Sequence, residues 1–81
     1  IICTEDIVEL TAGGEYEISY KLYDTNESRV SFAVSSGENV ITLDGNTVKV
    51  LESAAVGSMA SVKLTLENGK NTYDTLLIKV V

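Results

Sequence analysis

The chain has 81 residues, which is enough for one small domain. Its 12 acidic and 6 basic residues give a net charge of −6, and this acidity argues against binding to a nucleic-acid backbone. It has no His and one Cys, which excludes the commonest general base, an internal disulfide and a cysteine-rich zinc site. Val, Ile and Thr are abundant, and β-branched side chains favour strands over helices.

Period-two alternation of apolar and polar side chains predicts seven short strands. In chain order they span residues 7–10, 16–23, 30–34, 40–43, 48–51, 62–66 and 73–80. Turn-forming residues separate them, at 13–14, 24–27, 44–46 and 68–69. Asp44-Gly45 is a two-residue hairpin signal because both residues can take a positive φ, so the fifth strand should return antiparallel to the fourth. Residues 52–60 are mostly small and are predicted to form a loop.

Short strands with closely spaced turns are typical of an antiparallel β-sandwich, and a small closed barrel is the alternative. The apolar runs are a few residues long, far below the ~20 that a membrane-spanning helix needs, so no membrane insertion is expected. The chain does not begin with Met and finishes on an apolar strand that includes Leu76 and Val81. We therefore expect a module of a longer protein.

Three motifs occur in a characteristic order along the chain. Gly14-Glu15 precedes the second strand, residues 30–36 form an apolar-x-aromatic strand that finishes in Ser-Ser, and residues 56–60 form a turn of small residues before a strand. This order resembles the bacterial immunoglobulin-like domain of group 2 (BIG2), which occurs as tandem modules in surface adhesins and phage virion proteins. The resemblance covers residues 7–81. It departs from the family at Phe32, where Trp is common, and in a longer loop after Leu51.

The resemblance implies that residues 1–81 form a single immunoglobulin-like antiparallel β-sandwich. The family has no shared catalytic residues, so none carry over, and neither an enzyme nor a cofactor is expected. It implies a structural spacer or accessory module of a larger bacterial surface or phage virion protein. The expected location is therefore extracellular, on the cell surface or on the virion, with other domains of the same chain or other subunits as partners.

The alternative function is a recognition module for a host receptor, a glycan or a neighbouring subunit. Exposed turns or an open sheet edge would make the contact. The candidate interaction residues are Tyr23, Asp24, Asn26, Glu27, Asn68 and Lys70. Tyr23 falls on the face of the second predicted strand opposite Tyr16 and Tyr20, and an exposed Tyr can anchor an interface or stack on a sugar ring.

Acidic residues offer two candidate calcium sites. Residues 24–28 place oxygen side chains at alternate positions but lack the Gly and the distal Glu of a calcium loop. Glu5, Asp6 and Glu9 cluster near the first predicted strand, and Asp74 of the last predicted strand could approach them to form a second set of carboxylates. A turn and a solvated acidic surface are the simpler explanations, and no metal is expected.

Two further features have structural explanations. Cys3 is a lone thiol that we expect to be buried or idle. Ser35 and Ser36 are interpreted as the finish of a strand rather than as nucleophiles, because the chain offers no base other than carboxylates or Lys to activate them. Paired carboxylates for glycoside chemistry would need a cleft that a sandwich of this size hardly provides.

Overall fold

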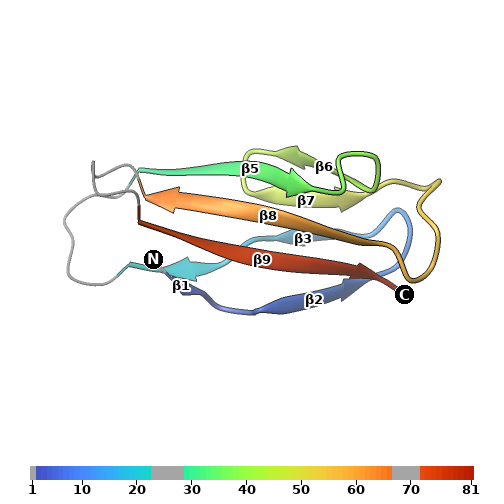
Figure 1. The fold of residues 1–81 in the computed structure, drawn as a ribbon, viewed down its shortest axis with the longest axis horizontal. Coiled ribbons are helices and arrows are strands. Elements are labelled where there is room, and N and C mark those ends of the chain that lie inside the picture. Colours follow the sequence, from blue (N-terminus) through green and yellow to red (C-terminus); the bar gives the residue numbers. More distant parts are fainter. Residues whose placement is uncertain (1, 23–28, 67–71) are drawn as a thin grey trace.

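The structure is a computed structural model that describes residues 2–22, 29–66 and 72–81. Regular structure within these ranges consists of β-strands (Figure 1). In chain order they are β1 (Ile2–Cys3), β2 (Ile7–Leu10), β3 (Glu15–Glu17), β4 (Tyr20–Lys21), β5 (Val30–Ser36), β6 (Ile41–Asp44), β7 (Thr47–Val50), β8 (Met59–Leu66) and β9 (Thr72–Val80). No helix in these ranges is long and apolar enough to cross a membrane. The predicted all-β class is confirmed.

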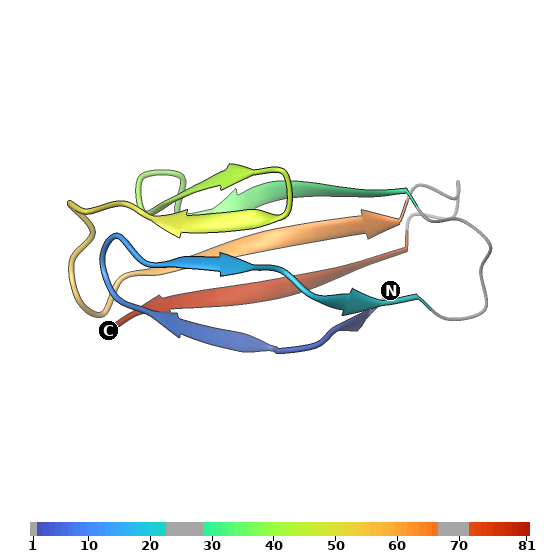
Figure 2. The ribbon, with the colours of Figure 1, turned by 180° about the vertical axis from the view of Figure 1, so that it is seen from behind.

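The strands form two packed layers (Figures 1 and 2). One layer is a four-stranded sheet in the order β2-β9-β8-β5, and the other holds the sheets β3-β7-β6 and β1-β4. The described pairs are antiparallel except for β2 and β9, which run parallel with Ile7 opposite Leu77 and Leu10 opposite Val80. The sandwich prediction is confirmed, with one parallel pair that the sequence pattern did not indicate.

The N-terminal segment is divided between the two layers. β1 pairs with β4 in one layer, and β2 pairs with β9 in the other. With β3 and β4 taken as one interrupted strand, the layers have the orders β1-β4/β3-β7-β6 and β2-β9-β8-β5. This is the strand arrangement of an immunoglobulin-like sandwich. A closed barrel does not form, since β5 and β6 are not paired with each other in the described parts of the chain.

The strand predicted over residues 16–23 is interrupted within its described part, residues 16–22, because it changes partner. β3 follows β7 as far as the pair of Glu17 and Thr47, where β7 begins. The Ile18 amide then donates to the Asn46 carbonyl at 2.8 Å. The next carbonyl, that of Ser19, accepts from the Thr4 amide at 3.0 Å, beside β1. This interruption and the additional β1 explain why nine strands are described where seven were predicted.

The hairpin between β6 and β7 forms one residue later than predicted. Asp44 pairs with Thr47, so the two loop residues are Gly45 and Asn46 rather than Asp44 and Gly45. Gly45 has φ +61°, which L-residues seldom adopt. The hairpin itself is confirmed, with Leu43 opposite Val48.

The loop predicted over residues 52–60 is shorter in the structure. β8 already begins at Met59. The Gly57 amide donates to the Val80 carbonyl at 2.8 Å, and the Val80 amide donates to the Ser58 carbonyl at 2.9 Å. These two bonds continue the pairing of β8 with β9 back into the loop.

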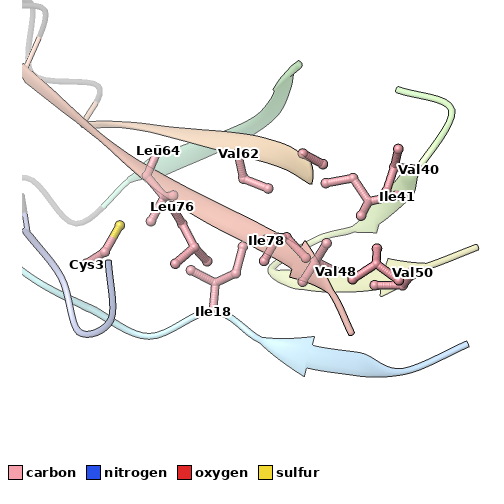
Figure 3. Close-up of a cluster of buried hydrophobic side chains, with 12 residues drawn as sticks. Cys3, Ile18, Val40, Ile41, Val48, Val50, Val62, Leu64, Leu76 and Ile78 are labelled. Carbon is pink, nitrogen blue, oxygen red and sulfur yellow. The ribbon is translucent and has the colours of Figure 1, made fainter. Parts of the chain in front are cut away.

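The hydrophobic core lies between the two layers (Figure 3). It is made by the inward-facing members of the alternating strands, and its buried side chains are Cys3, Ile18, Val40, Ile41, Val48, Val50, Ala60, Val62, Leu64, Leu76, Ile78 and Val80. Full burial of a Val, Leu or Ile side chain stabilises the fold by about 1.5–3 kcal/mol. The predicted inward faces of residues 16–23 and 73–80 are confirmed where described, with Ile18, Leu76 and Ile78 in this core.

Candidate functional site

The six predicted interaction residues lie outside the described residues. They are Tyr23, Asp24, Asn26, Glu27, Asn68 and Lys70. The strand ends on either side are placed: Val30 lies opposite Leu66, and Leu66 lies opposite Thr72. The candidate surfaces that the structure does describe are the β1–β9 junction, a serine cluster and the outer face and edge of the four-stranded sheet.

Asp74 joins the first strand to the last. Its Oδ2 accepts a hydrogen bond from the Cys3 amide at 2.8 Å, and its Oδ1 accepts one from the Thr75 amide at 2.9 Å. The bond from the Cys3 amide is the largest cause that lowers the pKa of Asp74 below its ordinary value of 3.8. The carboxylate is therefore an anionic acceptor that holds β1 against β9.

The acidic residues near the first strand do not gather into a metal site. Glu5, Asp6 and Glu9 are exposed, whereas both oxygens of Asp74 accept hydrogen bonds from backbone amides. Over residues 2–22, 29–66 and 72–81, no three Asp, Glu, Cys or His side chains are placed to hold a metal ion together. The described residues therefore give no support to the calcium site considered for this set of carboxylates.

Cys3 is buried, as expected, with 4% of its surface exposed. Burial is the main cause that raises the pKa of its thiol to about 11, and the negative charge of Asp74 adds to the rise. The thiolate is the nucleophilic and metal-binding form of cysteine. At neutral pH Cys3 is thus a protonated core side chain.

Three serine hydroxyls form a cluster where β5 bulges against β8. The pairing shifts between Val34 and Ser36, so that two residues of β5 face one residue of β8. The Ser61 hydroxyl lies 2.6 Å from the Ser35 hydroxyl and 2.7 Å from the Ser36 hydroxyl. Each hydroxyl has another hydroxyl as its partner, which satisfies these groups without activating one of them. The predicted finish of the strand at Ser35-Ser36 therefore takes the form of a bulge.

The outer face of the four-stranded sheet carries a mixture of small, polar and apolar side chains. The Lys63 ammonium lies 4.3 Å from the centre of the Tyr73 ring, a cation–π contact. Lys63 has Ala33 as its neighbour on β5 and Thr75 as its neighbour on β9. Tyr73 is 58% exposed. The inward alternation of Leu76 and Ile78 places Tyr73 and Thr75 on the outside, but no motif in the sequence predicts a role for this face.

Two edges of this sheet differ in charge. At β2, Glu9 lies within the strand and two further acids, Glu5 and Asp6, precede it. At the opposite edge, the seven residues of β5 (Val30–Ser36) carry no charge.

Comparison of the chain with protein-family models, with curated proteins and with solved structures gave no match.

Proposed function

We propose that the chain is a non-catalytic structural spacer or accessory module of a larger bacterial surface or phage virion protein. One observation carries the proposal: the chain enters and leaves the sandwich at opposite ends of its long axis. The domain measures 39 × 18 × 16 Å. β1 lies toward one end of the long dimension, and the C-terminus lies at the other (Figures 1 and 2). Domains attached to the two ends would be held apart by the length of the module.

Both ends of the chain are fastened to the sheets, which supports a rigid link. Near the start, the Cys3 amide is bonded to Asp74, and the Thr4 amide is bonded to the Ser19 carbonyl at 3.0 Å. At the finish, the Val81 amide donates to the Leu10 carbonyl at 2.9 Å. A segment attached at either end would therefore start from an ordered strand.

The surface or virion setting rests on the sequence resemblance to BIG2 domains. The serine pair at 35–36 and the turn before β8 are motifs of that resemblance, and in this chain they form the bulge and the loop that flank the packed strands. The proposed partners are accordingly neighbouring domains or subunits.

Replacement in the parent protein tests the spacer function. The intact mass of the native polypeptide is measured first, and a native chain of this size alone would overturn the proposal. In a longer parent, the segment is deleted in one variant and exchanged for an unrelated rigid domain of equal length in another. A spacer predicts that deletion impairs assembly or display and that the unrelated domain restores it. A recognition module predicts that only this sequence restores function.

A further inference from the structure

The outer edge of β5 is open. β5 pairs with β8 on one side, and no strand in the described ranges pairs with it on the other. Figure 1 shows it along the margin of its layer. The bulge between Val34 and Ser36 leaves residues 30–34 as the regular part of this edge. An unpaired strand presents a row of backbone donors and acceptors to any strand that can approach it.

The side chains of this edge suit close approach by another strand. On the outer face, Ser31, Ala33 and Ser35 are small and exposed. On the inner face, Val30, Phe32 and Val34 pack against the core but are only partly buried. An added strand would cover this apolar margin and meet no bulky outer side chain.

The absence of charge distinguishes β5 from the edge strands β2 and β6. Natural sheets protect their edges with charged side chains. Glu9 lies on the β2 edge, and Asp44 lies on the β6 edge, which has four residues. The seven residues of β5 carry no charge, although the chain as a whole has a net charge of −6. A second acidic copy therefore meets the least repulsion at β5.

We propose that β5 pairs antiparallel with β5 of a second copy of this chain. A two-fold axis normal to the sheet would join the two four-stranded sheets into one continuous sheet. Pairing of β5 with β5 brings no charged side chain of either strand to the interface, whereas β2 or β6 of a second copy would bring Glu9 or Asp44. The uncharged edge with small outer side chains is therefore complementary to itself, which favours a second copy of this chain as the partner.

Sedimentation equilibrium of two matched variants tests the proposal. Lys63 lies between Ala33 on β5 and Thr75 on β9, so A33E and T75E each add one carboxylate next to the same lysine. Either substitution should leave the monomer folded, which circular dichroism checks. In the dimer, A33E brings two carboxylates together near the two-fold axis, whereas T75E lies two strands away from the edge.

The expected result is a reversible dimer of the wild-type chain, with the dissociation constant raised at least about tenfold by A33E and changed less than about twofold by T75E. Amide exchange should slow at residues 30–34 as the protein concentration rises. A wild-type chain that remains monomeric at about 1 mM overturns the proposal. The proposal is also overturned if A33E dimerises as strongly as the wild type. It is likewise overturned if T75E weakens dimerisation as much as A33E does, because overall charge rather than this edge would then be the cause.

Discussion

The backbone amide of Cys3 donates a hydrogen bond to Asp74 across 71 positions of sequence, with 2.8 Å between the Cys3 nitrogen and Oδ2. The bond fixes β1 to β9 close to where the N-terminal segment crosses from the layer of β1 to the layer of β2. Because the acceptor is a carboxylate and the donor belongs to the backbone, the strength of the bond depends on the charge of Asp74 but not on the identity of residue 3.

Asp74→Asn should lower the free energy of unfolding by about 1–2 kcal/mol, because the charged acceptor of two backbone amides is lost. Urea denaturation measures the change. Glu9→Gln is the matched control, since it removes one charge from an exposed position on β2. That control should change stability by less than about 0.5 kcal/mol. Equal effects of the two substitutions would show that net charge, not the bond, matters.

The stability contributed by Asp74 should depend on pH in the acid range. Its pKa is lowered in the folded chain relative to 3.8, so the unfolded chain takes up the proton first as the pH falls. The contribution is therefore complete above the ordinary pKa and is lost as the pH falls through the folded pKa. Unfolding free energies of wild type and Asp74→Asn, compared from about pH 6 to about pH 2.5, should converge at the acid end. A constant difference would contradict the assignment.

Gly37→Ala should be severely destabilising. Gly37 has φ +77°, and a Cβ there would lie 2.6 Å from the Ala60 Cβ and 2.8 Å from the Met59 carbonyl oxygen. We expect a loss of at least about 3 kcal/mol, because backbone strain and a clash with β8 add together.

Gly45→Ala separates the two causes. Gly45 also has a positive φ, +61°, but a Cβ there would meet nothing within 4 Å. Only the strain of about 1–2 kcal/mol remains. In thermal or urea unfolding, Gly37→Ala should therefore be much less stable than Gly45→Ala. The reverse order of stability would show that Gly37 does not lie against β8 as described.

The Cys3 thiol should resist alkylation in the folded chain. Burial and the raised pKa of about 11 leave little accessible thiolate at pH 8. We expect iodoacetamide to react at least about 100-fold more slowly with the folded chain than with the urea-unfolded chain, because the thiolate is the reactive form. Mass spectrometry follows the modification. Similar rates in the two states would mean that β1 is not docked in the native chain.

The sequence predicted the strands and their buried faces because alternation is a local property. The inward-facing positions of Ile18, Leu76 and Ile78 follow directly from the two-residue period of a strand. The partner of each strand is not a local property. The interruption after Glu17 depends on where β7 begins, and the parallel pairing of β2 with β9 depends on residues about 70 positions apart. Neither feature can be predicted from the alternation of apolar and polar residues.

The features of the candidate surfaces likewise include some that the local sequence predicts and others that depend on strand pairing. Cys3 was expected to be buried, and its environment is confirmed. The bond from its amide to Asp74 and the cation–π contact of Lys63 with Tyr73 depend on register between strands. Turn-forming residues can be recognised by type in a sequence, so the candidate interaction turns are predictable without knowledge of the strand order. The absence of charge in residues 30–36 can also be seen in the sequence, but only the strand order shows that these residues form an open edge.

The parallel pair of β2 and β9 determines how the module would respond to tension. A pull on the two chain ends draws β2 and β9 in opposite directions along their common axis. Their hydrogen bonds lie across that direction, so they are sheared together instead of opening one after another. Stretching from Ile2 and Val81 should require a higher rupture force than stretching from Thr11 and Val81, which peels the same pair from one end. A chain with this topology is strongest along the line in which a spacer would be loaded.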